Sequence, residues 1–278
     1  MPKLGAHVSI AGGVNKAPER AKKQGCEVMQ IFVQNPQSYK TPETSPKTAS
    51  DFKAALKKYQ IKEAYAHAPY LVNLASSDNR IRYGSISLIQ RNLKRASLLG
   101  CKYLMMHLGS YGESDKKQGL ERTIKSLNKI LADYRGKCQL LIELSAGSGH
   151  ILGSRFEEIA QIIKALPQFK IGVCLDTAHI YASGYDLRNR KVIDQTLKKF
   201  DRAIGLSKLK LVHLNDSAAP FSSRKDRHAD IGDGQIKLKN LAAVLNHQLL
   251  KNINFILETP GSAERRKKDI EALRKLIK

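Results

Sequence analysis

Six residues of metal-binding type recur along the chain at similar positions, each at or near the end of a short apolar segment. They are His67, His107, Glu143, Asp176, His213 and Glu258. Imidazole nitrogens and carboxylate oxygens bind borderline divalent cations such as Zn²⁺. One such residue alone is usually a core polar group with a satisfied partner. Six gathered together would be very costly to bury without a cation, so the series predicts a metal centre.

Two segments add ligand candidates next to members of this series. His179 follows Asp176 by three positions, where a strand is expected to turn into a loop or helix. Asp226 and His228 are two positions apart, and in extended backbone they project to the same side. The resulting set has oxygen and nitrogen ligands and no cysteine, which suits two or three divalent ions, with Zn²⁺ expected and Mn²⁺ the alternative. The segment Gly232-Asp233-Gly234 is a turn signal and, on its own, weak evidence of phosphate binding.

The elements that would position these residues are short strands alternating with amphipathic segments. Strands are expected at Leu4–His7, Val28–Phe32, Glu63–His67, Tyr103–His107, Gln139–Glu143, Ile171–Asp176, Leu209–Leu214 and Ile253–Glu258. Helical spacing of apolar residues lies between them, and a last helix is expected at Ala263–Ile277. This pattern predicts an α/β fold, a single-domain (β/α)8 TIM barrel over residues 1–278. Active sites of such barrels lie at the C-terminal ends of the strands, where the candidate ligands fall.

The charge of the chain favours a polyanionic partner without identifying it. The 278 residues contain 48 Lys and Arg against 25 Asp and Glu, a formal net charge of +23. Lys and Arg near phosphates release condensed counterions, although a basic proteome explains such an excess equally well. No apolar run approaches the roughly 18 residues of a membrane-spanning helix. The four scattered cysteines and the absence of signal-peptide features lead us to expect a cytoplasmic protein.

Several motifs together resemble those of the endonuclease IV family, in matching order and spacing from near Leu4 to Glu258. They are Gly5-Ala6-His7-Val8-Ser9, His67-Ala68-Pro69-Tyr70, His107-Leu108-Gly109-Ser110, Gly172-Val173-Cys174-Leu175-Asp176-Thr177-Ala178-His179, His213-Leu214-Asn215-Asp216-Ser217, Asp226-Arg227-His228 and Leu257-Glu258-Thr259-Pro260. The resemblance implies a DNA-repair enzyme with three Zn²⁺ per chain that hydrolyses double-stranded DNA on the 5′ side of abasic sites. It would leave a 3′-hydroxyl and a 5′-deoxyribose phosphate. We expect it to act as a monomer.

The resemblance also assigns the ligands to individual ions. One Zn²⁺ would bind His67 and His107, with Glu143 bridging to the second ion. The second ion would take Asp176, His213 and Glu258, and the third would take His179, Asp226 and His228. Glu143 is also the expected catalytic residue, because it would help to hold the attacking hydroxide.

The same resemblance points to residues that contact DNA. Tyr70 and Leu71 would enter the gap left by the missing base, unless they only pack at the top of the barrel. Gln37 and Arg227 are further candidates, the latter as a phosphate contact. The chain departs from the family at Gln37 and Tyr39, where Arg and Trp are common. It also has Leu144-Ser145-Ala146-Gly147 in place of Asn-Thr-Ala-Gly. These departures affect the expected DNA distortion and a contact around the ligands, and they remove no ligand.

Two other classes of function remain open. A sugar isomerase or epimerase would use Glu143, Asp176, His213 and Glu258 alone, but this leaves the remaining histidines and the charge of +23 unexplained. A non-catalytic nucleic-acid-binding barrel would bind without turnover, although it would be expected to have lost some ligands. Metal content would distinguish an isomerase from a nuclease, and DNA cleavage would distinguish a nuclease from a non-catalytic binding protein.

Overall fold

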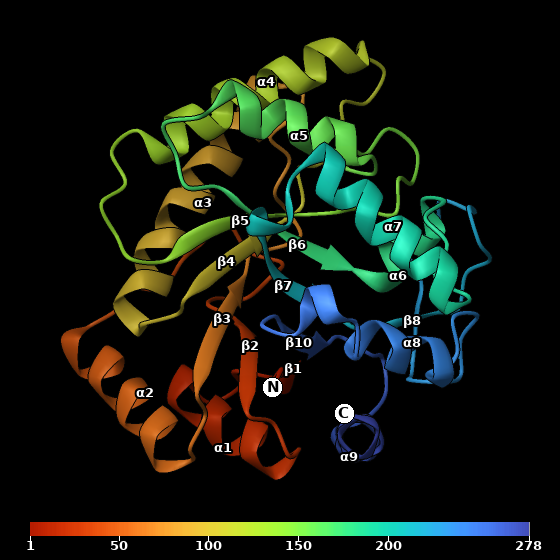
Figure 1. Ribbon diagram of the computed structural model, residues 1–278. Coiled ribbons are helices and arrows are strands. Elements are labelled where there is room, and N and C mark those ends of the chain that lie inside the picture. Colours follow the sequence, from red (N-terminus) through yellow and green to blue (C-terminus); the bar gives the residue numbers. More distant parts are fainter. Residues whose placement is uncertain (278) are drawn as a thin grey trace.

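The chain folds into a closed barrel of parallel strands surrounded by helices, which a computed structural model describes for residues 1–277 (Figure 1). The barrel strands are β1 (Leu4–His7), β2 (Val28–Phe32), β3 (Glu63–His67), β4 (Tyr103–Met106), β5 (Gln139–Glu143), β6 (Gly172–Asp176), β7 (Leu209–His213) and β10 (Asn254–Leu257). Around the barrel they follow the order β1-β10-β7-β6-β5-β4-β3-β2 and close on themselves. The predicted α/β TIM barrel is confirmed. Lys278, the last residue of the predicted single domain, lies outside the described residues.

The predicted strands agree with the observed ones to within one residue at each end. β4 ends at Met106 and β10 at Leu257, so His107 and Glu258 stand just beyond their strands. The hydrogen-bonded ladder fades gradually at the barrel mouth. The amide of Leu214, one residue past β7, still donates to the Ile256 carbonyl at 2.8 Å. Leu214, the extra residue of the predicted seventh strand, therefore still pairs with its neighbour.

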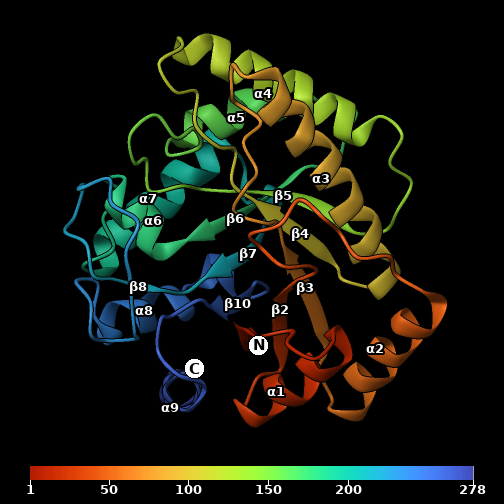
Figure 2. The ribbon, with the colours of Figure 1, turned by 180° about the vertical axis from the view of Figure 1, so that it is seen from behind.

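Helices cover the outside of the barrel in both views (Figures 1 and 2). The α-helices are α1 (Ala17–Lys23), α2 (Pro46–Lys58), α3 (Asn79–Leu99), α4 (Lys116–Leu131), α5 (Phe156–Ala165), α6 (Thr177–Ala182), α7 (Arg190–Ala203), α8 (Leu238–Leu245) and α9 (Ala263–Leu276). Short 3-10 turns are η1 (Val14–Lys16), η2 (Leu206–Lys208) and η3 (Gln248–Leu250). Side-chain caps fix several starts: Asp78, for example, accepts the amide protons of Arg80 and Ile81. Within residues 1–277, no helix is long and apolar enough to cross a membrane.

Alternate strand residues face two separate apolar cores. Outward-facing residues pack against the helices in the larger core, which includes Phe52, Phe156 and Phe200. Inward-facing residues form a second cluster inside the barrel. This inner cluster consists of Val28, Tyr65, Met105, Leu141, Cys174, Leu211 and Ile256. On β1 the matching position is Gly5, where an added Cβ would lie 1.9 Å from the Val28 carbonyl oxygen, so a larger residue does not fit.

A two-stranded antiparallel sheet, which the sequence pattern did not predict, is formed by the segment that connects β7 to α8. It pairs β8 (Asp216–Ser217) with β9 (His228–Ala229), in the register Asp216 to Ala229 and Ser217 to His228. Strands of two residues leave too short an alternation to detect in a sequence. The pairing folds the long loop after β7 back on itself and returns His228 to the barrel mouth.

Candidate metal centre

Eight side chains form a ring at the C-terminal mouth of the barrel, each two positions beyond the inner cluster or Gly5. Because side chains alternate along a strand, a residue two positions further on faces the barrel interior as well. The members of this mouth ring are His7, Gln30, His67, His107, Glu143, Asp176, His213 and Glu258. Six of the eight are the metal-binding residues that the sequence singled out. The period of the strands thus explains why residues so far apart in the chain meet.

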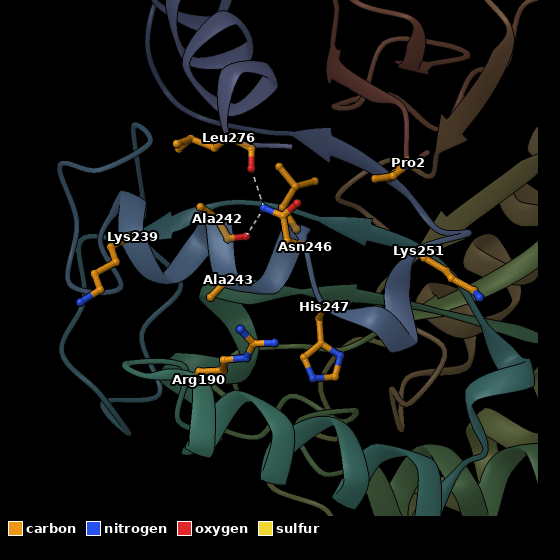
Figure 3. Close-up of a pocket in the computed structure, with 10 residues that line it drawn as sticks. Pro2, Arg190, Lys239, Ala242, Ala243, Asn246, His247, Lys251 and Leu276 are labelled. Carbon is orange, nitrogen blue, oxygen red and sulfur yellow. Dashed lines mark hydrogen bonds between the residues drawn. The ribbon is translucent and has the colours of Figure 1, made fainter. Parts of the chain in front are cut away.

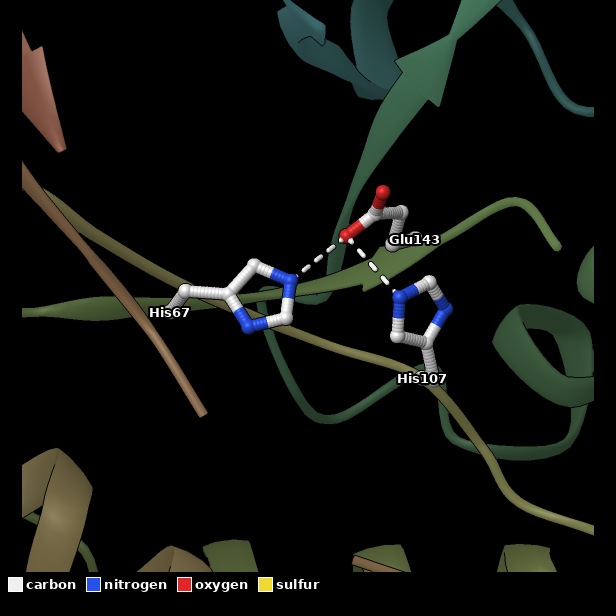
Figure 4. Close-up of side chains that lie close together, drawn as sticks. All are labelled: His67, His107 and Glu143. Atoms are coloured by element: carbon white, nitrogen blue, oxygen red, sulfur yellow. Dashed lines mark hydrogen bonds and ion pairs between the residues drawn. The ribbon is translucent and has the colours of Figure 1, made fainter. Parts of the chain in front are cut away.

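The first group of ligand atoms lies between β3, β4 and β5 (Figure 4). His67 Nε2 is 2.9 Å and His107 Nε2 is 3.6 Å from the same oxygen, Oε2 of Glu143. The other ring nitrogen of His67 lies 2.7 Å from the Ala68 carbonyl oxygen, which can only accept a hydrogen bond. Nδ1 of His67 therefore carries the proton, and the lone pair on Nε2 points at the group.

The second group consists of Glu143, Asp176, His213 and Glu258, whose ligand atoms lie within 4.8 Å of one another. Nδ1 of His213 is 3.0 Å from Oε1 of Glu143 and 3.1 Å from Oε2 of Glu258. Glu143, Asp176 and His213 are fully buried. Glu143 belongs to the first group through Oε2 and to the second through Oε1. A carboxylate placed in this way can bridge two cations.

The third group lies on the solvent side of the first two. Asp176, His179 and His228 offer atoms within 4.8 Å of one another, and Asp226 stands beside them with its side chain 53% exposed. One Asp226 oxygen is 3.2 Å from His179 Nε2 and the other is 3.5 Å from His228 Nε2. His179 presents Nε2 because its Nδ1 donates to the Leu144 carbonyl at 2.9 Å. Asp176 therefore joins the residues expected here from the sequence, and Asp226 adjoins them.

The electrostatics of these groups suit cations. Burial by itself would raise the pKa of Glu143, but the positive charges of His213 and His107 outweigh it and hold this pKa well below its ordinary value. Burial would likewise raise the pKa of Glu258, and His213 again lowers it well below the usual range. Burial opposes the charged form of His179, yet Asp176 and Asp226 raise its pKa well above 6.5. Ionised carboxylates packed this closely need positive charge beside them, so the donor set fits two or three divalent ions.

Two buried amides that the sequence did not single out also touch the ligands. Asn215 donates to Asp176 Oδ2 at 2.6 Å and accepts the amide proton of Glu258 at 2.7 Å. Gln30, in the middle of β2, contacts His213, His7 and Glu258. Asn215 lies in a motif quoted above, and Gln30 is a polar residue within an apolar strand. These two features, an Asn within a family motif and a Gln inside an apolar strand, are the sequence signals that could have identified them.

The candidate ligands open into a cavity of about 390 Å³. Tyr70 stands at its edge with 69% of its surface exposed, and its ring meets Phe32 edge-on at 5.2 Å. The next residue, Leu71, is partly buried, and its carbonyl accepts a hydrogen bond of 3.3 Å from the Tyr39 hydroxyl. Gln37 and Arg227 are exposed, on the loop after β2 and beside Asp226 respectively.

The amides of the loop that contains Gly232 and Gly234 are already engaged. Both glycine amides donate to the buried carboxylate of Asp216, at 3.2 and 3.1 Å. The amides of Ile236 and Lys237 donate to the same carboxylate. The weak indication of phosphate binding at this turn is therefore wrong, because Asp216 already occupies the position that an anion would take.

A second hollow, of about 340 Å³, lies between α7, α8 and the end of α9 (Figure 3). Arg190, Lys239, Lys251 and His247 are among the residues that line it. Within the described part of the chain, its lining includes no carboxylate and none of the candidate ligands. The chemistry that the candidate ligands could support therefore belongs at the barrel mouth.

Comparison with known proteins first defines the class. Residues 18–276 match the family model described as a xylose isomerase-like TIM barrel. A D-tagatose 3-epimerase-like protein shares the fold, with a TM-score of 0.77 at 20% identity over 99% of this chain and 96% of that one. The chain is thus a TIM barrel of the xylose isomerase-like class, with candidate metal ligands at the ends of its strands.

Closer relatives define the family within that class. "Probable endonuclease 4" of Halothermothrix orenii is 41% identical over 270 residues, which cover 97% of each chain. The protein of the same name in Clostridium botulinum is 38% identical over the full length of both chains. The crystal structure of endonuclease IV from Thermus thermophilus has a TM-score of 0.87 at 36% identity, covering 99% of this chain and 98% of that one. The chain belongs to the endonuclease IV family.

Proposed function

We propose that this protein is a Zn²⁺-dependent DNA-repair endonuclease that hydrolyses the phosphodiester bond on the 5′ side of abasic sites in duplex DNA. The products would be a 3′-hydroxyl and a 5′-deoxyribose phosphate. The observation that carries the proposal is the sharing of Glu143 and Asp176 among three groups of ligand atoms at one open barrel mouth. Membership of the endonuclease IV family and the net charge of +23 support a DNA substrate.

In this proposal Glu143 is shared between the first two ions, and the third ion has ligands of its own. His67, His107 and Glu143 would hold the first, Glu143 with Asp176, His213 and Glu258 would hold the second, and His179, Asp226 and His228 would hold the third. When bound, clustered cations lower the pKa of a water molecule toward neutrality and clamp the attacking and departing oxygens of a phosphodiester. Zn²⁺ suits this mixture of imidazole and carboxylate, with Mn²⁺ an alternative at one site.

Glu143 has the central part among the side chains. It is fully buried, and its oxygens face histidines of all three groups. Its lowered pKa keeps it ionised at neutral pH, as a bridging ligand requires. A carboxylate held in this way can orient the attacking water toward the phosphorus and fix the spacing of the ligand groups on both sides.

Damage recognition falls to the rim of the cavity. An abasic nucleotide costs less to extrude from the helix because no base stacks or pairs there. Tyr70 stands exposed beside the candidate ligands, and with Leu71 it forms the wedge that we assign to the gap in the stack. Gln37 and Arg227 are the proposed contacts to the duplex on either side.

The decisive experiment uses a duplex with a single tetrahydrofuran analogue of an abasic site. This analogue blocks lyase chemistry, so a nick on its 5′ side that a chelator abolishes must come from metal-dependent hydrolysis. A matched duplex without the lesion should stay intact. Binding without any nick would favour the non-catalytic alternative, and nicking in the presence of excess chelator would exclude the metal mechanism.

Metal analysis tests the isomerase alternative separately. An isomerase would need only the group of Glu143, Asp176, His213 and Glu258, which leaves His67, His107, His179 and His228 without a function. About three Zn²⁺ per chain supports the nuclease, because all three groups would be filled. One or two Mn²⁺ or Mg²⁺ per chain, with turnover of a free sugar, would support the isomerase.

A further inference from the structure

The mouth ring contains two residues that are not among the proposed metal ligands, His7 and Gln30. Gln30 lies in β2 with no exposed surface, two positions beyond Val28 of the inner cluster. It therefore faces the same interior as the ligands. A buried amide is costly unless each of its donors and acceptors has a partner, so its partners determine what it does.

The Gln30 amide makes three side-chain contacts, two of them to candidate ligands and the third to His7. Its oxygen is 2.8 Å from His213 Nε2. Its nitrogen is 2.9 Å from His7 Nδ1 and also donates to Oε1 of Glu258. The amide therefore joins the buried edge of one candidate ligand to the carboxylate of another.

The orientation of this amide is set by Glu258. An ionised carboxylate only accepts hydrogen bonds, so the NH₂ group of Gln30 must face it and the oxygen must face His213. That oxygen accepts a proton, which places the proton of His213 on Nε2. In the neutral imidazole that a metal requires, the lone pair of His213 then lies on Nδ1, the nitrogen that stands 3.0 Å from Glu143 and 3.1 Å from Glu258.

We infer that Gln30 is a positioning residue of the second ligand group, which holds His213 in the tautomer that presents Nδ1 and fixes the direction of Glu258. The inference rests on the proposed metal centre. Hydrogen bonds that orient a ligand commonly change metal affinity by about 10- to 100-fold. The second ion should therefore depend on Gln30, whereas the first and third should not.

Gln30→Leu removes all three hydrogen bonds at similar volume, and Gln34→Leu is its matched control. Gln34 is also almost fully buried, but its amide contacts Ser38, Thr41 and Asn92, away from the ligands. In competition with a graded series of chelators, we expect Gln30→Leu to lose one Zn²⁺ of three at a chelator strength about 10- to 100-fold below that required by the unmodified protein. Gln34→Leu should retain all three.

Heteronuclear NMR of the histidine rings in the Zn²⁺-loaded protein reports the tautomer directly. A retained Nε2 proton on His213 is expected in the unmodified protein and in Gln30→Glu, which keeps an acceptor for it. It should be lost or exchange faster in Gln30→Leu. Gln30→Glu should still bind the second ion weakly, because a new carboxylate faces Glu258.

The outcomes separate this inference from the proposed function. An unmodified protein that retains no Zn²⁺ would overturn the metal centre itself. An unmodified protein with three ions, together with a Gln30→Leu variant that holds all three as tightly and keeps the same His213 tautomer, would overturn only the part given to Gln30. Equal losses in the Gln30 and Gln34 variants would show a general effect of buried amides and would also overturn it.

Discussion

At the scale of single residues, Glu143 is the side chain on which the proposed chemistry most depends. Glu143→Gln keeps the shape and one oxygen but removes the negative charge shared by two ligand groups. We expect the fold and much of the affinity for abasic DNA to persist while cleavage falls by about 100- to 1000-fold, as for loss of a central electrostatic group. Single-turnover cleavage and equilibrium binding of the tetrahydrofuran duplex measure the two separately. Cutting near the unmodified rate would remove Glu143 from the mechanism.

The raised pKa of His179 leads to a prediction about protons. Asp176 and Asp226 hold this pKa well above 6.5 against the effect of burial, so the metal-free imidazole is protonated at neutral pH. Zn²⁺ can bind only after that proton leaves. Metal uptake should therefore release about one proton per chain or more at neutral pH and weaken as the pH falls. The release should decline as the pH rises through the raised pKa.

Calorimetry of Zn²⁺ binding in buffers of different ionisation enthalpy measures this release. The matched control is His150→Asn, because His150 lies in the loop after β5 and its ring packs beside Tyr111 at 5.1 Å instead of facing the ligands. Proton release should be unchanged in that variant. Zn²⁺ uptake at neutral pH without any proton release would show that His179 is already neutral, contrary to the expectation.

At the scale of the elements, the meeting of the candidate ligands was predictable because parallel strands carry them to one edge. A metal-binding residue at the end of strand after strand is a pattern of sequence alone, and the period of two explains why His67 and Glu143 meet. Gln30 was not predicted, since one amide inside an apolar strand has no spacing that connects it to His213. The approach of Asp226 to His179 and His228 depends on how a long loop folds back through β8 and β9, which no local pattern specifies.

The end of the loop between β9 and α8 is held in place by one buried carboxylate. Asp216 accepts hydrogen bonds from the amides of Gly232, Gly234, Ile236 and Lys237. Asp216→Ala would leave several buried N–H groups unpaired, and we expect a loss of about 3 kcal/mol in the free energy of unfolding. Asp233→Asn is the control in the same loop, because its carboxylate is 60% exposed and its 2.9 Å ion pair with Arg265 should contribute less than about 1 kcal/mol. Urea unfolding of the metal-free proteins measures both, and similar losses in the two would contradict the part given to Asp216.

At the scale of the whole molecule, the two ends of the barrel differ in what fills them. At the end where the strands begin, partly buried polar groups bond to one another: the Tyr65 hydroxyl donates to Glu63 at 2.7 Å and accepts from Asn254 at 2.7 Å. Lys102 completes this set through a 2.9 Å ion pair with Glu63. Each of these partners is supplied by the chain. At the mouth, the carboxylates outnumber what the chain can neutralise without protonated histidines, so that end is the one where we propose that external cations bind.

The net charge of +23 gives the last prediction, which concerns the salt dependence of DNA binding. Each phosphate contact made by a Lys or Arg adds about 0.9 to the slope of log affinity against log salt concentration. Arg227, exposed beside Asp226 at the mouth, should make such a contact, so Arg227→Ala should weaken binding of abasic DNA and lower the slope by about 0.9. Lys199→Ala removes the same charge from the outer helix α7 and should leave the slope unchanged. Equal slopes in the two variants would mean that DNA responds to the total charge and not to the barrel mouth. The slope depends on the position of a charge only where that charge contacts a phosphate directly, since salt screens distant charges on every surface alike.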